Sequence, residues 1–198
     1  MLERAQRLIT HLDLKAHPEG GYFREIFRSA SAVQPTDGRA RRSALTTIYY
    51  LLHAGQHSRW HRVRSDEVWH FYEGDPLELW IAVADFAHIE CTVLGADAAV
   101  AAHVATVPAG CWQAARPKGT HALVGCTVAP GFDFADFTLL RQDPAAQELL
   151  NRRGGALAGL AYSAGSTTPA PQGLRRRRFI PAVLLRHQHA VDGVDDTV

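Results

Sequence analysis

Eight short runs between residues 21 and 140 constrain the fold of this chain more than any other feature of its sequence. Each run is rich in β-branched and aromatic residues and is bounded by Gly, Pro or Asp, which is typical of β-strands separated by tight turns. The runs are GYFREIFRS, SALTTIYYLL, EVWHFY, LELWIAVAD, IECTVLG, HVATVPAG, HALVGCTVAP and DFADFTLL. Eight strands at such short spacing predict an all-β domain, either a closed barrel or two packed sheets.

Helical patterns flank this β region on both sides. Residues 2–14 place apolar side chains at intervals of three and four, which predicts an amphipathic helix. Residues 143–153 can form a second helix, with Asp143 as N-cap and Pro144 at its first position. Beyond it the chain is dominated by Gly, Ala, Ser, Thr and Pro and then by an arginine run, without a structural period. We therefore expect one folded domain over residues 1–152 and a low-complexity, disordered, basic tail over residues 153–198.

Composition excludes several classes of protein. Lys and Arg number 21 against 20 Asp and Glu, so the net charge of +1 provides no field that would attract nucleic acid or an anionic membrane. No stretch approaches the roughly 20 uncharged apolar residues that span a bilayer, and the N-terminus lacks a signal peptide. The three cysteines lack C-x-x-C spacing and suggest neither a disulfide framework nor a thiolate zinc site. A cytoplasmic protein with no nucleic-acid or membrane partner is expected.

The densest group of chemically active residues is GQHSRWHRVRSDEVWHFYEG, residues 55–74. Gly55 is followed after five residues by His61, and then come Val63, Glu67 and Gly74. Alternate positions of a strand point to one face, so His61 and Val63 look into the barrel together and Glu67 joins them from the next strand. This spacing resembles the first motif of the cupin superfamily, with Val63 where that motif has its second histidine.

A second segment resembles the other cupin motif. In PAGCWQ, residues 108–113, Gln113 stands where the fourth metal ligand of a cupin would be. The resemblance implies a degenerate metal site made of His61, Glu67 and Gln113. One imidazole, one carboxylate and a neutral amide form a poor, weakly selective set for a transition metal. The expectation is therefore no tightly bound cofactor and, at most, weak binding of a divalent metal.

Five collinear segments over about residues 5 to 145 extend the resemblance. HPEGGYFREIFRS, TTIYYLL, SRWHRVRSDEVWHFYEGDPLELW, VPAGCWQAA and LVGCTVAPGFDFADF are similar to the uncharacterised cupin type 5 family, the yeast-type proteins related in fold to dTDP-sugar 3,5-epimerase. The resemblance implies a double-stranded β-helix, to which the two helical patterns add a short helix at each end of the domain. It also implies a homodimer and a small-molecule pocket inside the barrel, with no assigned reaction.

Three residues are candidates for catalysis. His61 can act as general base or metal ligand, and the alternative is a core histidine bonded to Glu67. Glu67 can hold a metal, orient His61 or shuttle a proton, because a carboxylate inside a barrel must be paired or hydrogen-bonded. Tyr22, or another pocket tyrosine, is the candidate acid on the opposite side of a substrate.

Five residues are candidates for ligand binding. Glu19 belongs to the PEGG segment that borders the pocket in the family resemblance, and Gln113 offers a donor and an acceptor to a sugar hydroxyl or a carbonyl. Trp69 and Phe71 form either apolar pocket walls or ordinary core filling. His57 lies either at the pocket mouth or in an exposed turn.

Two further pairs of charged residues remain open. Arg24 and Arg28 could meet an anionic ligand, although a solvated strand face is the commoner outcome for such residues. Asp133 and Asp136 lie near the end of the barrel, where either could pair with a histidine.

Three functions fit these residues. The first is an epimerase or isomerase, resembling the sugar-nucleotide enzymes, that acts on a small sugar-like or carboxylate-bearing metabolite with His61 as base. The second is a small-molecule-binding cupin without turnover, which the incomplete ligand set and the aromatic residues would suit. The third, ranked last, is a metal-dependent oxygenase.

Overall fold

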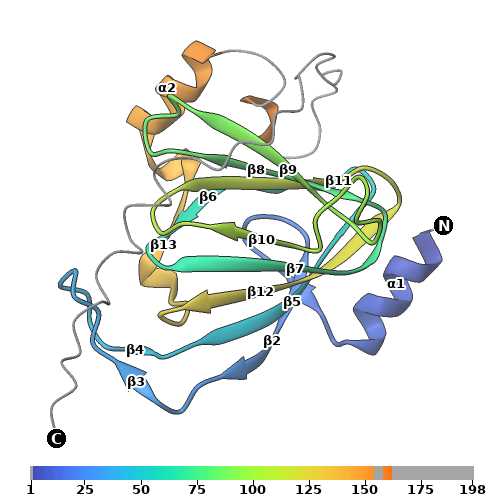
Figure 1. Cartoon of the computed structure of the whole chain (residues 1–198), viewed down its shortest axis with the longest axis horizontal. Coiled ribbons are helices and arrows are strands. Elements are labelled where there is room, and N and C mark those ends of the chain that lie inside the picture. The colour runs from blue at the N-terminus through green and yellow to red at the C-terminus, as the bar shows by residue number, and fades with distance from the viewer. Residues whose placement is uncertain (1, 154–157, 162–198) are drawn as a thin grey trace, which may run out of the picture.

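Two antiparallel sheets face each other in the computed structural model, which describes residues 2–153 and 158–161 (Figure 1). The six-stranded sheet has the order β1 (Lys15–Ala16), β2 (Tyr22–Arg28), β5 (Thr46–His53), β12 (His121–Ala129), β7 (Asp66–Gly74) and β10 (Val104–Val107). The five-stranded sheet has the order β13 (Phe137–Leu139), β6 (Ser58–Val63), β11 (Trp112–Pro117), β8 (Leu77–Ala82) and β9 (Ile89–Leu94). This arrangement is the expected double-stranded β-helix.

Helices cover the outer faces of both sheets. The helix α1 (Leu2–His11) buries Ala5 and Leu8 against the outer face of the six-stranded sheet, where they meet Leu51 and Leu123. The helix α2 (Pro144–Arg153) packs on the five-stranded sheet and begins as expected, because the Asp143 carboxylate accepts a hydrogen bond from the backbone N–H of Ala146 at 3.0 Å. No helix of the described residues is long and apolar enough to cross a membrane.

The described residues continue past residue 152, the expected boundary of the domain, to Arg153 and then over residues 158–161. The short 3-10 helix η3 (Ala158–Ala161) contacts β6 and α2 and places Leu160, only 5% exposed, in a cluster with Trp60, Phe86 and Leu150. Burial of this leucine therefore attaches residues 158–161 to the five-stranded sheet. The rest of the expected tail lies outside the described residues.

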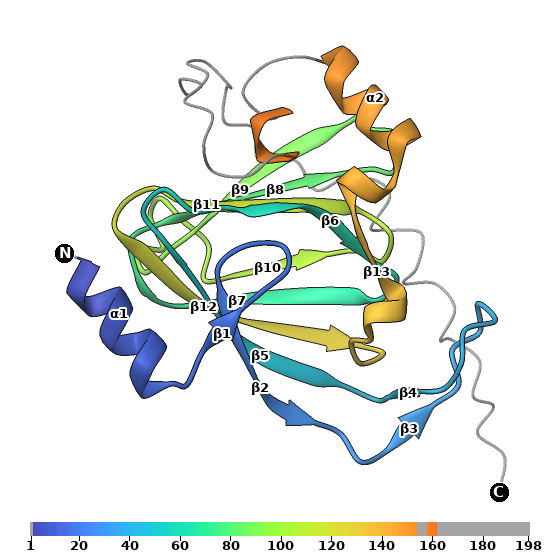
Figure 2. The same cartoon turned by 180° about the vertical axis from the view of Figure 1, so that it is seen from behind.

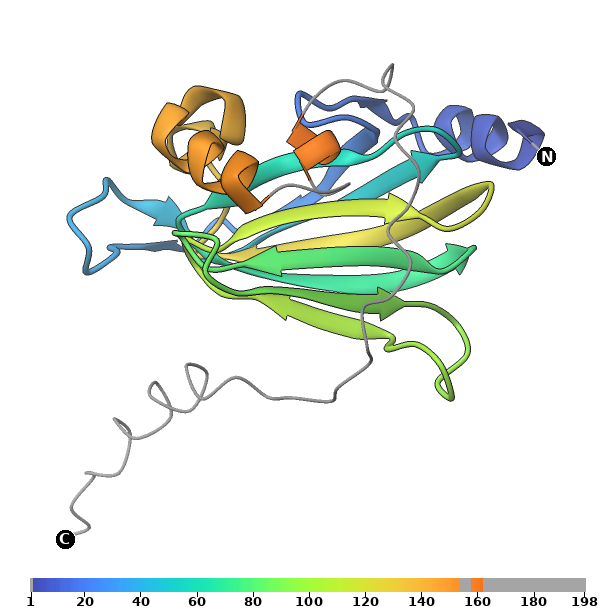
Figure 3. The same ribbon diagram turned by 90° about the horizontal axis from the view of Figure 1, so that it is seen from above.

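Two kinds of interior result from this layering. Near one end of the barrel the sheets are joined by apolar side chains, including Trp69, Leu79 and Val124. Near the other end the chain leaves the sheets in a projecting hairpin of β3 (Ala32–Val33) and β4 (Arg42–Ser43), which Figure 3 shows from above. A cavity lies between the sheets there.

Candidate functional site in the barrel

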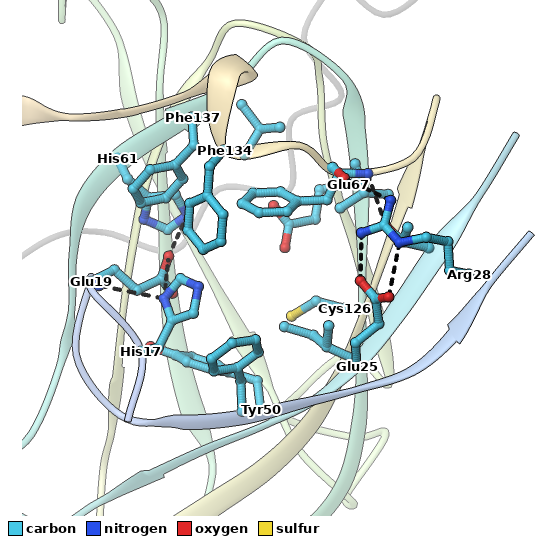
Figure 4. A pocket seen from close by; sticks show the side chains of 16 residues that line it. His17, Glu19, Glu25, Arg28, Tyr50, His61, Glu67, Cys126, Phe134 and Phe137 are labelled. Carbon is cyan, nitrogen blue, oxygen red and sulfur yellow. Dashed lines mark hydrogen bonds and ion pairs between the residues drawn. The ribbon is translucent and has the colours of Figure 1, made fainter. Parts of the chain in front are cut away.

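The cavity has a volume of about 110 Å³ and is lined by both sheets and by two loops (Figure 4). Alternation along β5 points Thr46, Ile48 and Tyr50 inward, and the facing register of β12 adds Cys126 and Val128. The remaining lining residues are His17, Glu19, Phe23, Glu25, Arg28, His61, Val63, Glu67, Phe132, Phe134 and Phe137. The cavity thus combines ionisable side chains with aromatic and aliphatic walls.

The PEGG segment forms a tight turn that brings Glu19 into the barrel. Gly20 and Gly21 have φ values of +113° and +68°, and a Cβ at Gly20 would lie 2.4 Å from the carbonyl oxygen of His57. Figure 2 shows the loop after β1 reaching from the six-stranded sheet toward the other sheet, where the backbone N–H of Arg59 donates to the carbonyl oxygen of Glu19 at 2.8 Å. The two glycines therefore allow the loop to cross the open end of the barrel.

Glu19 lies against His61 inside the cavity. Its Oε2 atom is 3.2 Å from His61 Nε2, and its Oε1 atom accepts a hydrogen bond from Ser58 Oγ at 2.9 Å. The other ring nitrogen of His61, Nδ1, is 2.8 Å from the carbonyl oxygen of Arg59. Because a carbonyl oxygen only accepts, Nδ1 carries a proton, and Nε2 of the neutral ring therefore presents a lone pair to Glu19.

His17 approaches the same carboxyl group from the other side. Its Nδ1 atom is 3.5 Å from Glu19 Oε2 and accepts a hydrogen bond from the backbone N–H of Glu19 at 3.4 Å. Both neutral rings consequently direct lone pairs at one carboxyl oxygen. A single proton at Glu19 Oε2 can therefore be shared among the three groups, which we call the Glu19 cluster (His17, Glu19 and His61).

Burial favours the neutral forms of this cluster. Desolvation raises the pKa of Glu19 above its usual value, although the neighbouring His17 and the hydrogen bond from Ser58 oppose it. Desolvation also lowers the pKa of His17 and of His61, against the attraction of Glu19 and Glu67 respectively. These directions favour a protonated Glu19 between two neutral imidazoles, so that a proton can pass between Glu19 Oε2 and His61 Nε2.

A second carboxyl group, that of Glu67, is held by a chain of hydrogen bonds. The Trp69 indole N–H donates to Gln113 Oε1 at 2.9 Å, and Gln113 Nε2 donates to Glu67 Oε2 at 2.6 Å. Since an indole nitrogen can only donate, it fixes which end of the Gln113 amide faces Glu67. Burial raises the pKa of Glu67, while His61 and the hydrogen bonds from Gln113 and Cys126 oppose the rise.

The hydrogen-bond chain argues against the implied metal site. With its oxygen taken by Trp69, Gln113 offers only an NH₂ group to the interior, and an NH₂ donor does not ligate a metal. Val63 supplies no ligand at the second histidine position. Among residues 2–153 and 158–161, no group of three or more His, Cys, Asp or Glu side chains is arranged to hold a metal ion. The residues present therefore do not fit a cupin metal centre.

The structure brings together only part of the expected site. His61, Glu67 and Glu19 line the cavity, whereas Tyr22 stacks on His53 outside it and His57 lies in the turn before β6. Three other candidates also lie outside the cavity lining. Trp69 and Gln113 are buried behind Glu67, and Phe71 packs against the core. The tyrosine that does line the cavity is Tyr50, which donates a hydrogen bond to the carbonyl oxygen of Gly20 at 2.8 Å.

Two aspartates near the barrel end pair differently from the expectation, because neither contacts a histidine of the described residues. Asp133 caps the 3-10 helix η1 (Phe134–Asp136), accepting a hydrogen bond from the backbone N–H of Ala135. Asp136 is 3% exposed and binds two arginines, Arg39 at 3.0 Å and Arg42 at 2.8 Å. This ion-pair cluster attaches the β3–β4 hairpin to η1, which carries Phe134 over the cavity.

We expect Glu67→Gln to stabilise the protein more at pH 8 than at pH 5. Because the folded pKa of Glu67 is raised above its usual 4.5, the folded protein holds a proton that the unfolded chain releases. The contribution of the Glu67 carboxyl to the stability of the wild type is therefore complete below pH 4.5 and is lost as the pH rises through the pKa of Glu67 in the folded protein. Glutamine has no such proton and can still accept from Gln113. Thermal unfolding at both pH values measures the difference, expected to be on the order of a few degrees at pH 8.

The matched control is Glu73→Gln, on the same strand but in a surface ion pair with Arg4 that lowers the Glu73 pKa. This variant should show no gain at pH 8. An equal effect of Glu67→Gln at both pH values would contradict the raised pKa of Glu67.

Comparisons with known proteins cover the part of the chain that carries the cavity. The profile of the family described as Cupin superfamily (DUF985) matches residues 6–140. A hypothetical protein from Leishmania major is 32% identical over 78% of this chain and 96% of its own, with a TM-score of 0.71. An X-ray structure of a protein from Shewanella oneidensis is 34% identical over 68% of this chain and 82% of its own, with a TM-score of 0.62. No curated protein matches the chain.

Proposed function

This chain belongs to the cupin type 5 family of the cupin superfamily, and from that premise we propose that it is an enzyme that moves a proton at a carbon atom next to a carbonyl group in a small polar metabolite. The observation that carries the proposal is Glu19 Oε2 lying between two histidine nitrogens, at 3.2 Å and 3.5 Å, in an enclosed cavity. Such a cluster exchanges a proton at little cost, which is the requirement for general acid–base catalysis.

The two proton-carrying groups lie on opposite walls. His61 belongs to β6 of the five-stranded sheet and Glu67 to β7 of the six-stranded sheet, and both line the cavity (Figure 4). A substrate carbon held between them can lose its proton to one group and regain a proton from the other on the opposite face. Epimerisation, or movement of a double bond, is the expected result.

Tyr50 has a positioning role in this proposal. Burial, followed by the neighbouring Glu19, raises its pKa well above the usual value, so the phenol stays protonated. Its hydroxyl donates to the PEGG turn and thereby supports the loop that carries Glu19.

The size of the cavity favours a small substrate. A volume of about 110 Å³ lies below the roughly 300 Å³ at which pockets for drug-sized ligands begin. A compact sugar-like or carboxylate-bearing compound therefore suits the cavity better than a complete sugar nucleotide.

Binding without turnover is the second candidate function. The aromatic walls formed by Phe23, Phe134 and Phe137 favour it, because they provide contact area for a ligand but no acid or base.

A cytoplasmic location remains part of the proposal.

A homodimer is also proposed, through the outer edge of β2. Strand β1 pairs only with Tyr22 and Phe23, so among the described strands none covers the edge from Glu25 to Arg28. Ile26 and Phe27 are 40% and 53% exposed along it. Light scattering of the full chain, with Phe27→Lys as the variant, tests this arrangement. Loss of the dimer in the variant is expected.

Deuterium exchange tests the proposed chemistry directly. The full chain is incubated in D₂O with glyceraldehyde, dihydroxyacetone, lactate and pyruvate, and proton NMR follows the hydrogen on the carbon next to the carbonyl or carboxyl group. Exchange of at least one compound above its spontaneous rate is expected. Binding of a compound without any exchange would instead support the receptor.

Histidine NMR tests the shared proton without a substrate. Long-range ¹H–¹⁵N spectra should show a neutral His61 protonated at Nδ1 and a neutral His17 protonated at Nε2 at pH 7, with His→Gln variants assigning the signals. A His61 ring protonated at both nitrogens at that pH would contradict the placement of the proton on Glu19.

A further inference from the structure

An irregularity in β2 places two opposite charges at the mouth of the cavity. On a regular strand, residues 25 and 28 would point to opposite faces. The register of β2 against β5 shifts between Glu25, which pairs with Ile48, and Phe27, which pairs with Thr47. This β-bulge turns Arg28 to the inner face, beside Glu25.

Within the described lining, Arg28 is the only Lys or Arg side chain. Its Nε and Nη2 atoms donate to the two oxygens of Glu25 at 2.9 Å and 2.6 Å, and Nη1 donates to the carbonyl oxygen of Phe132 at 3.2 Å. The hydrogen bond from Nη1 to the backbone thus fixes the guanidinium on one side, and on the other side Nε and Nη2 are parallel donors that can bind one carboxylate. A carboxylate fills that face in the free protein.

We propose that Arg28 is the substrate-recognition residue, binding a carboxylate of the substrate at the site that Glu25 occupies in the free protein. This inference rests on the proposed function and narrows it to small carboxylic acids. Two parallel N–H···O bonds from a guanidinium match any carboxylate, so a ligand carboxylate can replace that of Glu25 with the same geometry. Glu25 is 36% exposed at its side chain and can turn to solvent when displaced.

The position of Arg28 also orients the substrate. Figure 4 shows Arg28 and Glu25 on one side of the cavity and the Glu19 cluster on the other. A carboxylate bound to Arg28 directs its α-carbon inward, toward His61 and Glu67. The class of substrate that fits is a 2-hydroxy or 2-keto acid of few carbon atoms. Burial raises the pKa of Glu19 and of Glu67, which reduces the repulsion that an entering anion meets beside them.

Lactate and pyruvate are the probes for a binding test, with lactamide as the uncharged counterpart of lactate. Isothermal titration of the full chain compares wild type with Arg28→Gln, Arg28→Lys and Glu25→Gln. We expect Arg28→Gln to weaken binding of at least one acid by about 10- to 100-fold, since a hydrogen-bonded charge pair is lost. Arg28→Lys should lie between, because it keeps the charge but not the fork. Glu25→Gln should tighten binding several-fold, since it removes the competing carboxylate.

Arg24→Gln is the matched control, with the same charge change on the same strand but outside the cavity lining. It should leave binding unchanged. The inference fails if neither acid binds to wild type or Glu25→Gln at millimolar concentration, if lactamide binds as well as lactate, or if Arg28→Gln binds like wild type.

These results separate the inference from the proposed function. Binding of an acid through Arg28 without deuterium exchange would retain the recognition site and refute the enzyme. Exchange of glyceraldehyde at equal rates in wild type and Arg28→Gln, with no binding of either acid, would retain the enzyme and refute the recognition site.

Discussion

Replacing Glu19 with glutamine is expected to lower the rate of deuterium exchange by about 10²- to 10⁴-fold, the usual contribution of a positioned acid or base. The substitution keeps the size and shape of the side chain, and its carbonyl oxygen can still accept the hydrogen bond from Ser58. Its NH₂ group, however, would donate to His61 Nε2 and hold the lone pair that Glu19 now faces at 3.2 Å. The proton that Glu19 can exchange with His61 would be lost.

Stability separates this effect from damage to the fold. Glu19 is fully enclosed and its pKa is raised by burial, so a neutral amide should leave the thermal midpoint at pH 7 unchanged or higher. Glu90→Gln, a change of the same size at a partly exposed ion pair with His88, is the control and should exchange at the wild-type rate. A Glu19→Gln protein that exchanges within threefold of wild type would show that the Glu19 cluster carries no proton in the reaction.

Most of the longer strands were predictable because their residues match the physical requirements of a pleated surface. β11, which is not among the eight expected runs, shows where such a prediction fails. Trp112–Pro117 contains two alanines, a glutamine and a proline, which have low β-propensity. It is a central strand because β6 and β8 flank it. Both faces are buried, and Ala114 and Ala115 are small enough to fit between the layers. The residues of β11 alone do not indicate that it is a central strand, because its burial depends on β6 and β8, which are distant in sequence.

The candidate site was predictable where a residue sits on a regular strand. His61 and Glu67 follow from strand alternation and motif spacing, and both line the cavity. The sequence leaves Arg28 open between an anionic ligand and a solvated strand face, because the bulge that turns it inward depends on pairing with β5. His17 precedes the PEGG turn, where no periodicity indicates the direction of a side chain.

Gln113 shows a different limit of sequence reasoning. Its place in the motif predicted a ligand, but the amide is fully used in holding Glu67. The signal that was available is the indole of Trp69, a buried donor that requires an acceptor nearby. Strand alternation puts Trp69 and Glu67 on one face, so a side chain bonded to both was foreseeable once β11 was known to lie opposite.

Asp136→Asn is expected to destabilise the protein by about 3–5 kcal/mol, the range for breaking a buried ion pair by removing one partner. The Asp136 carboxylate binds both Arg39, which is 8% exposed, and Arg42. Asparagine would leave two enclosed guanidiniums facing a neutral amide. Thermal unfolding should show a fall in midpoint of roughly 6–20 °C for a domain of this size.

The dependence of this loss on pH follows from the pKa of Asp136. Burial acts to raise that pKa, but the hydrogen bond and charge of Arg42 and the charge of Arg39 outweigh burial and hold it below the usual 3.8. The stability from Asp136 is therefore complete above pH 3.8 and disappears as pH falls through the folded pKa. The difference between variant and wild type should be constant from pH 8 to 6 and shrink toward pH 3.

Asp133→Asn tests whether the charge pairing, rather than any change in η1, is responsible. Asp133 caps the same 3-10 helix, and asparagine caps about as well as aspartate, so this variant should differ little from wild type. The double variant Asp136→Asn with Arg39→Gln should lose less stability than the two single losses added, because the contact between Arg39 and Asp136 is then lost only once. Strictly additive losses would mean that Arg39 and Asp136 do not interact. Because η1 carries Phe134 over the cavity, Asp136→Asn should also weaken the binding of lactate or pyruvate, whichever of the two wild type binds. Such a loss would show that the Asp136 carboxylate connects the β3–β4 hairpin to the cavity.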